Sequence, residues 1–158
     1  MDNKQFCLAL HDFKDTVYRV ALNYLKNPHN AEDICQEVFV RLYRTVKPPE
    51  EHEHLKAWLI RVTLNECKRF LASPWNRLCS IDECLQLPFF DQPELNGVYS
   101  AVMKLPQKYR IAIYLHYYEG YSTGEIGSIL GISTSAVCSR LERARKKLKI
   151  MLLEEENV

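Results

Sequence analysis

The 158-residue sequence lacks a long apolar run, and no stretch approaches the roughly 18 consecutive apolar residues of a membrane-spanning helix. The first twenty residues also lack the apolar core of a signal peptide, because Asp12, Lys14 and Asp15 interrupt them. We therefore expect no insertion of the chain itself into a membrane, and a cytoplasmic location.

Net charge is also nearly absent, since 21 lysines and arginines against 20 acidic residues give a formal charge of +1. Any affinity for a polyanion must therefore be local. Residues 74–98 carry one arginine against four acidic residues, whereas residues 134–149 carry six cations against Glu142 alone. The middle of the chain is acidic and its last predicted helix is basic.

The six cysteines lack the two close pairs that are typical of zinc fingers and ribbons. Cys79 and Cys84 are the only near pair, and His52 and His54 are the partners that a zinc site could recruit. Reduced thiols packed as small hydrophobic residues are the other interpretation, and the one we prefer. The sequence also lacks a nucleophile set and a phosphate-cradling glycine loop, so we expect no metal, no cofactor and no enzyme activity.

Strand-like alternation is missing over any useful length, and the sequence predicts an all-α protein. Apolar residues recur every three or four positions in three segments, which predicts three helices. The first covers residues 3–26, the second is capped by Asn30 and ends before Pro48, and the third covers residues 55–72. The charged segment 47–54, with two prolines, is predicted to be an exposed loop. Residues 1–73 are thus expected to form a bundle of three to four helices.

The periodicity is lost from residue 74 to residue 93, where prolines recur and the charge is negative, which predicts a flexible acidic linker. Helices resume in a second small domain, residues 94–158. Ser122 is predicted to cap a short helix that stops at Gly131, and Ser133 to cap the last helix. Two helices joined by Gly-Ile-Ser, the second of them basic, are typical of a helix-turn-helix.

In the last helix, Val137, Leu141 and Ala144 share one side and are expected to pack inward. Ser135 and Ser139 lie opposite, with arginines along one flank. Small hydroxyl side chains and guanidinium groups can enter a major groove together. The alternative is a solvated basic helix on an ordinary bundle.

The helix over residues 55–72 carries Trp58, Arg61, Asn65, Lys68 and Arg69. Together they offer an aromatic ring, an amide that can pair with base edges, and cations for a backbone, which is what separated DNA strands require. Taken singly, each also fits a core position or a solvated face.

Three segments in order resemble the extracytoplasmic-function sigma factors, short RNA polymerase specificity subunits of the sigma-70 superfamily. They are "AEDICQEVFVRLYR" (31–44), "LKAWLIRVTLNECKRFL" (55–71) and "LPQKYRIAIYLHYYEGYSTGEIGSILGISTSAVCSRLERARKKL" (105–148). The resemblance spans nearly the whole chain. It implies sigma region 2 at residues 1–73, a linker at 74–93 and sigma region 4 at 94–158. It also implies a transcription initiation factor that binds core RNA polymerase, directs it to promoters and nucleates DNA melting.

The resemblance also implies roles for individual residues and for partners. The largest-subunit clamp coiled coil of the polymerase would meet Asp33, Gln36 and Glu37, and a second contact would involve the subunit near the flap. The loop 47–54 would hold a base flipped from the minus-ten element, and the residues for that element would be Lys47, His52, His54, Trp58, Arg61, Asn65, Lys68 and Arg69. The residues for the minus-thirty-five element would be Thr134, Ser135, Cys138, Ser139, Arg140 and Arg143.

Three positions depart from the family pattern: Arg69 stands where an aspartate is frequent, Cys138 where a lysine is frequent, and Ala136 where a threonine is frequent. The resemblance further implies promoter DNA as a ligand and an anti-sigma protein, frequently membrane-tethered in the family, as a partner. The acidic linker would thread the polymerase channel that later carries RNA, or serve as a plain tether.

Two other functions remain open at this point. One is a stand-alone helix-turn-helix DNA-binding transcriptional regulator that binds duplex DNA as a dimer. The other is an interaction protein with a thiol-based or zinc-based sensor. A stand-alone regulator would bind DNA without polymerase, whereas a sigma factor would need it. Stoichiometric zinc in the purified protein would indicate the sensor.

Overall fold

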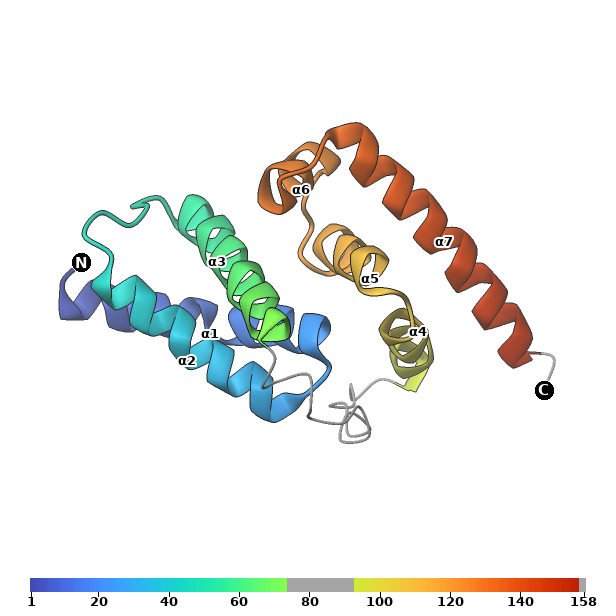
Figure 1. Cartoon of the computed structure of the whole chain (residues 1–158), viewed down its shortest axis with the longest axis horizontal. Coiled ribbons are helices and arrows are strands. Elements are labelled where there is room, and N and C mark those ends of the chain that lie inside the picture. The colour runs from blue at the N-terminus through green and yellow to red at the C-terminus, as the bar shows by residue number, and fades with distance from the viewer. Residues whose placement is uncertain (74–92, 157–158) are drawn as a thin grey trace. The chain divides into compact units, whose positions relative to one another are not determined.

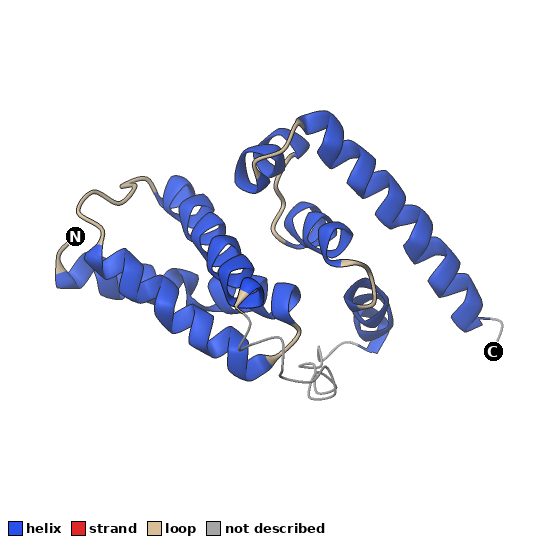
Figure 2. Cartoon of the chain, viewed as in Figure 1, coloured by secondary structure: helices blue, strands red, loops and turns tan. Residues whose placement is uncertain are grey.

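The protein is described from a computed structural model, in which residues 1–73 and 93–156 are described. The chain divides into two compact units, residues 1–87 and 88–158. Every regular element in the described residues is a helix, as predicted (Figure 2). The predicted linker lies outside the described residues, apart from Pro93. None of the described helices combines the length and the apolar character needed to cross a bilayer.

The first unit consists of α1 (Asn3–Leu25), α2 (Pro28–Arg44) and α3 (His52–Ala72), which pack against one another (Figure 1). Their core is formed by Ala9, Phe13, Val17, Ala21, Leu22, Ala31, Ile34, Val38, Phe39, Leu42, Leu55, Leu59 and Cys67.

Helix α2 begins three residues earlier than predicted. Asn27, not Asn30, is its cap, and the Asn27 side chain accepts a hydrogen bond from the Asn30 backbone N–H at 3.0 Å. Pro28 follows as the first helical residue, where its missing N–H and fixed φ cost nothing. The prediction of Asn30 as the cap was therefore wrong.

Helix α3 also begins earlier than predicted, at His52, so the prediction that His52 and His54 belong to an exposed loop was wrong. Pro48 and Pro49 exclude a helix only around themselves. The first turn of α3 is exposed and polar, so it carries no apolar periodicity, and that signal begins at Leu55.

The cysteines occupy different environments. Cys67 is buried in the first core, and burial raises its pKa to about 12, so it packs as a neutral thiol, as predicted. Cys35 is half-buried and also packs against this core, whereas Cys7 and Cys138 are exposed and are not packed as predicted. Cys79 and Cys84 lie outside the described residues.

The second unit consists of α4 (Pro93–Met103), α5 (Gln107–Ile113), a π-helical turn η3 (Tyr114–Tyr118), α6 (Thr123–Leu130) and α7 (Thr134–Glu156). The side chain of Arg110 is buried, and its Nη1 donates to the Leu105 carbonyl at 2.9 Å, across the turn between α4 and α5. Helices α4, α5 and α6 all contact α7.

The turn η3 changes which residues of this segment are buried. The Glu119 N–H donates to the carbonyl of Tyr114, five residues earlier, at 3.2 Å. This wide turn leaves Tyr114 and Leu115 buried and Tyr117 56% exposed. A regular 3.6-residue period continued from Tyr109 and Ile113 would instead place His116 or Tyr117 on the apolar face.

The predicted helix-turn-helix is present. The Ser122 hydroxyl accepts from the Glu125 N–H at 3.2 Å, and the Ser133 hydroxyl accepts from the Ala136 N–H at 3.1 Å. Gly131 ends α6 with a left-handed φ of 70°. Gly127 faces the turn so closely that an added Cβ would lie 2.8 Å from the Ile132 carbonyl oxygen.

We expect Gly127→Ala to lower the free energy of unfolding by about 1–3 kcal/mol, because the new methyl group must displace a backbone carbonyl. Gly124→Ala is the matched control in the same helix, since its Cβ would meet nothing within 4 Å. The control should be neutral or stabilising by up to about 1 kcal/mol. Urea denaturation of the full chain measures both, and equal effects would contradict the close approach.

Candidate nucleic-acid interface

One face of α2 is exposed and carries Asp33, Gln36 and Glu37, opposite the apolar stripe that the helix buries. At the spacing of this helix, Val40 and Tyr43 extend the same face, and they are 40% and 58% exposed. The sequence analysis missed these two residues. They could have been found in the sequence, because Val40 is apolar and Tyr43 is aromatic, yet neither falls on the stripe of α2 that is expected to be buried. The face combines acids, an amide and apolar surface.

Helix α3 presents a second exposed stripe. His54, Trp58, Arg61, Asn65 and Lys68 are spaced by four, three, four and three residues, which places them within an arc of about 80° at 100° per residue. Trp58 is half-buried against the first core, and the other four are exposed. The structure therefore brings these five predicted residues together on one helix face.

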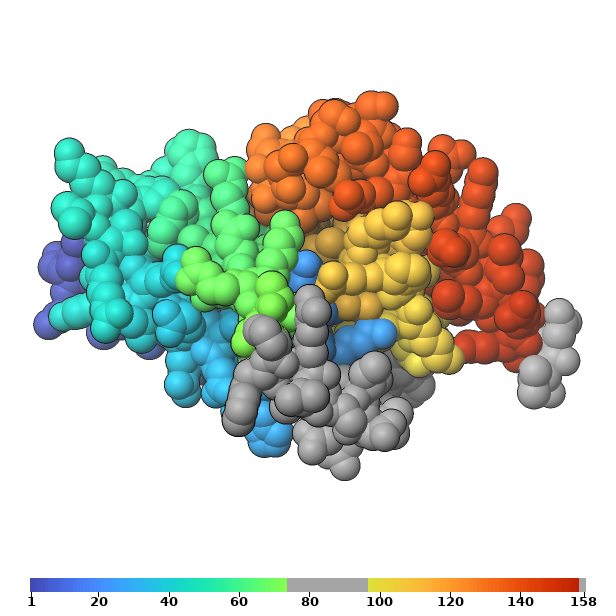
Figure 3. Space-filling model, viewed as in Figure 1, coloured from blue at the N-terminus to red at the C-terminus, as the bar shows by residue number. Residues whose placement is uncertain are grey.

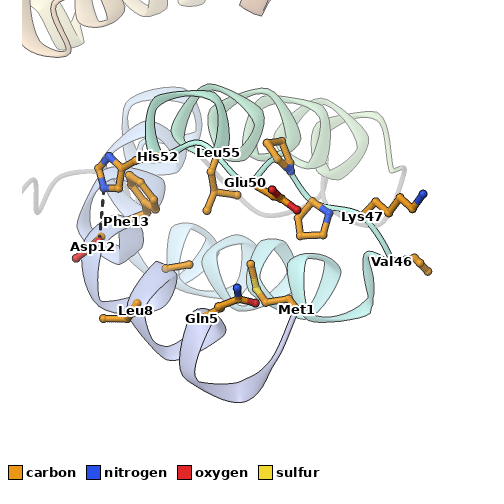
Figure 4. Close-up of a pocket in the computed structure, with 13 residues that line it drawn as sticks. Met1, Gln5, Leu8, Asp12, Phe13, Val46, Lys47, Glu50, His52 and Leu55 are labelled. Atoms are coloured by element: carbon orange, nitrogen blue, oxygen red, sulfur yellow. Dashed lines mark ion pairs between the residues drawn. The ribbon is translucent and has the colours of Figure 1, made fainter.

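His52 and Lys47, from the same predicted set, lie elsewhere. The His52 ring packs on Phe13 at 4.6 Å between centroids, and its Nε2 lies 3.5 Å from Asp12 Oδ2 (Figure 4). Lys47 is exposed in the segment before α3, at the rim of the neighbouring pocket, and its side chain points outward (Figure 4). His52 thus faces α1, away from His54 and the stripe.

A pocket of about 720 Å³ lies between the first half of α1 and the segment that connects α2 to α3 (Figure 4). Its walls are both apolar and charged. The lining residues are Met1, Gln5, Leu8, Ala9, Asp12, Phe13, Val46, Lys47, Pro48, Pro49, Glu50, His52 and Leu55.

Arg69, at a position where this chain departs from the family pattern, lies near a carboxylate of its own helix. Its Nη1 is 3.5 Å from Glu66 Oε1, and the same oxygen lies 2.7 Å from Arg41 Nη2 of α2. Glu66 is buried, whereas the side chain of Arg69 is largely exposed. Glu66 therefore links α2 to α3 through its ion pair with Arg41, and Arg69 remains accessible at the edge of this pair.

The first turns of α7 lie on the surface of the second unit, next to α6 (Figure 3). Arg140 is half-buried on one flank. Glu142 and Lys146 face the same way as Ser139 and pair at 3.4 Å. The other predicted residues of this helix are all exposed, namely Thr134, Ser135, Cys138, Ser139 and Arg143.

A cluster that the sequence analysis missed joins α5 to α7. It consists of Lys108, Tyr109, Arg143 and Lys147, and we refer to it as the Tyr109 cluster. The Nζ atoms of Lys108 and Lys147 lie 5.0 and 5.8 Å from the centroid of the Tyr109 ring. The hydrogen bond with Arg143, together with the charges of Lys108 and Arg143, lowers the pKa of the Tyr109 phenol. Sequence periodicity gave no sign of the cluster, because its halves are 35 residues apart.

An apolar groove of about 610 Å³ lies along the second half of α7. Arg145 is fixed at its edge, because its Nε donates to the Tyr117 hydroxyl at 2.6 Å. The lining residues are Val98, Val102, Ile113, Tyr117, Tyr118, Arg145, Leu148, Lys149, Leu152, Leu153 and Glu156.

Histidine, cysteine and acidic side chains do not gather in threes as a metal site anywhere in residues 1–73 or 93–156. His54 Nδ1 instead lies 3.1 Å from Glu51 Oε2. The cysteine pair of the zinc alternative is not among the described residues.

Two family profiles match the chain, one for each unit. "Sigma-70 region 2" matches residues 10–77, and "Sigma-70, region 4" matches residues 95–148. Both matches follow the order that the sequence analysis predicted.

Curated relatives of similar length match over most of the chain. The ECF RNA polymerase sigma factor SigM of Bacillus subtilis is 30% identical, over 88% of this chain and 90% of SigM. The RNA polymerase sigma factor SigV of the same species is 29% identical, over 94% of this chain and 91% of SigV.

Solved structures share the fold. The sigma factor RpoE from Bartonella quintana, solved in complex with the anti-sigma factor NepR, superposes with a TM-score of 0.75 at 23% identity, over 94% of this chain and 97% of RpoE. CnrH, solved in complex with the cytosolic domain of CnrY, gives a TM-score of 0.68 at 25% identity, over 96% and 89% of the two chains.

The two profiles and the two relatives, which match over most of the chain, agree on the family. The chain belongs to the extracytoplasmic-function sigma factors of the sigma-70 family, and it is a non-enzymatic transcription initiation factor.

Proposed function

We propose that this initiation factor binds core RNA polymerase through α2, contacts duplex promoter DNA through α7 and captures unpaired bases with α3. The observation that carries the proposal is that α2 and α3 each gather several predicted residues on one exposed face, and that the start of α7 exposes five of its six predicted residues. The domain limits proposed with it are region 2 at residues 1–73, an acidic linker at 74–93 and region 4 at 94–158.

The exposed face of α2 is proposed to meet the clamp coiled coil of the largest polymerase subunit. Asp33 and Glu37 are exposed carboxylates one turn apart, which suits pairing with arginines. Val40 and Tyr43 add apolar surface beside them, as is common at the centre of protein interfaces. Because polymerase acts in the cytoplasm, the proposal places the chain there as well.

The apolar groove beside α7 is proposed to receive the polymerase segment near the flap. Val98 and Leu153 are 39% and 49% exposed along it, so an apolar helix could bury both. CnrH was solved with the cytosolic domain of CnrY. We propose that this chain likewise has a protein partner of the anti-sigma class that its family implies.

The minus-ten element is proposed to meet the stripe on α3. Asn65 can hydrogen-bond to base edges, Trp58 can stack, and Arg61, Lys68 and Arg69 can hold the backbone. The pocket beside residues 46–50 is proposed to take the flipped base. Lys47, at the rim of this pocket, is proposed to contact the backbone of the same DNA strand. His54 belongs to the same stripe, whereas the contact of His52 with Phe13 favours a supporting role in the wall of the pocket.

The minus-thirty-five element is proposed to meet the start of α7. Ser135 and Ser139 allow close approach to base edges, with Thr134 and Cys138 beside them. Arg143 and the half-buried Arg140 lie on one flank, which suits contacts to phosphates.

Run-off transcription tests the proposed function directly. Core polymerase plus the purified chain should produce transcripts with discrete starts on genomic DNA, and core alone should not. Tight protection of a promoter fragment by the chain alone, with no effect on core, would instead indicate a stand-alone helix-turn-helix regulator. Stoichiometric zinc in protein purified without chelators would favour the sensor alternative.

We expect Asp33→Arg to weaken binding to core polymerase by about tenfold or more, because it places a cation against the arginines that the carboxylate would pair with. Glu32→Arg is the matched control, since it reverses the same charge one residue earlier, on the side of α2 near Tyr18. Fluorescence anisotropy of the labelled chain with core measures both affinities. Equal losses, or none, would remove Asp33 from the interface.

We expect Asn65→Ala to reduce binding of the reconstituted holoenzyme to a single-stranded minus-ten oligonucleotide by about 5- to 100-fold, because a base contact is lost. Asn3→Ala, an exposed amide on α1, is the control and should change nothing. Unchanged affinity of Asn65→Ala, with core binding intact, would show that this face does not read the strand.

A further inference from the structure

Three cations from two helices meet at one buried aromatic ring in the Tyr109 cluster. Lys108 comes from the start of α5, and Arg143 and Lys147 come from α7. Tyr109 itself is buried, and its hydroxyl is in a hydrogen bond with Arg143. Packing therefore holds the ring in place, and the three exposed cations surround it.

Lys108, Arg143 and Lys147 differ from Lys146 and Lys104 of the same unit, which are paired with carboxylates. Lys146 pairs with Glu142 at 3.4 Å, and Lys104 pairs with Glu155 at 3.6 Å. For Lys108, Arg143 and Lys147, no carboxylate lies within ion-pair distance among the residues that the structure describes. The lowered pKa of the Tyr109 phenol arises first from its hydrogen bond with Arg143 and then from the charges of Lys108 and Arg143. The three like charges around the ring also repel one another. An anion bound among them would relieve that repulsion.

The position of the cluster relative to the recognition face identifies the anion. Ser139, Arg143 and Lys147 follow one another at four-residue spacing, so they form one row along α7. Eight residues of helix span about 12 Å, which is about the width of the major groove. With Ser139 at a base edge, Lys147 and the adjacent Lys108 would reach the phosphates at the wall of the groove.

We propose that Lys108, Arg143 and Lys147 form a binding site for the phosphodiester backbone of duplex DNA, built from α5 and α7 together. Tyr109 is its positioning residue, because it fixes Arg143 and seats both lysines. The proposal rests on the proposed function, since it supplies the phosphate contacts of the duplex that α7 reads. It adds Lys108, Tyr109 and Lys147, which lie outside the residues carried over from the family.

The salt dependence of holoenzyme binding to a promoter duplex tests the site. Each phosphate contact contributes about one unit to the slope of log affinity against log salt. Lys108→Gln and Lys147→Gln should each lower the slope by about one and the affinity by roughly three- to tenfold near physiological salt. The double variant should lower the slope by about two. Lys104→Gln is the control, because this lysine is exposed on the same unit and paired with Glu155.

Tyr109→Phe separates positioning from charge. It removes the hydroxyl that holds Arg143 but leaves every cation in place, so affinity should fall while the salt slope stays within about half a unit of wild type. A slope loss as large as that of Lys108→Gln would overturn the positioning role. Lys108 and Lys147 are exposed, so their variants should fold, and circular dichroism checks this.

Other results would overturn the proposal in distinguishable ways. Slopes of the lysine variants equal to that of Lys104→Gln, with a wild-type holoenzyme that initiates normally, would overturn this site alone. Weaker binding to core polymerase with an unchanged DNA slope would place the cluster against the polymerase instead. A wild-type chain that gives no polymerase-dependent initiation would overturn the proposed function and this site with it.

Discussion

Each helix of this protein must bury one apolar stripe in a small core, and the positions of its functional side chains follow from that constraint. Helix α2 buries Ile34, Val38 and Leu42, so Asp33 and Glu37 are exposed on its other face. Helix α7 buries Val137, Leu141 and Ala144, which leaves its serines and cations outside. Side chains on a rigid helix face keep a fixed spacing without further support.

Local electrostatics matters more here than the total charge, which is close to zero. Glu66, buried in the first unit, pairs with Arg41 and so joins the helix proposed to bind polymerase to the helix proposed to bind separated strands. In the second unit, cations from one flank of α7 and from the start of α5 surround the Tyr109 ring, and no carboxylate in the described part of the chain lies within ion-pair distance of them. The same protein therefore uses an ion pair on a buried glutamate to hold helices together, and it carries a group of cations that we propose to bind a ligand.

Much of the fold and of the candidate site was predictable from the sequence because it depends on local signals. Ser122, Gly131 and Ser133 determine the ends of α6 and the start of α7 through short-range hydrogen bonds and a left-handed glycine, and all three were correctly identified. Asn30 was predicted as the cap of α2, but Asn27 caps it, because Pro28 favours the first helical position. The polar first turn of α3 had no periodic signal, and the displacement of Tyr117 by the π-helical turn depends on backbone geometry. The Tyr109 cluster depends on packing between distant segments, which no local pattern contains.

The contact between Arg145 and Tyr117 has a consequence for the symmetry of the basic helix. That guanidinium is tied to an aromatic hydroxyl on one side of α7, while Lys146 is matched by Glu142. The neutral hydroxyl leaves the charge of Arg145 in place but holds it on the side of α7 away from Arg143 and Lys147. A phosphate bound beside Arg143 and Lys147 would therefore receive no contact from Arg145, which is held on the other side of the same helix.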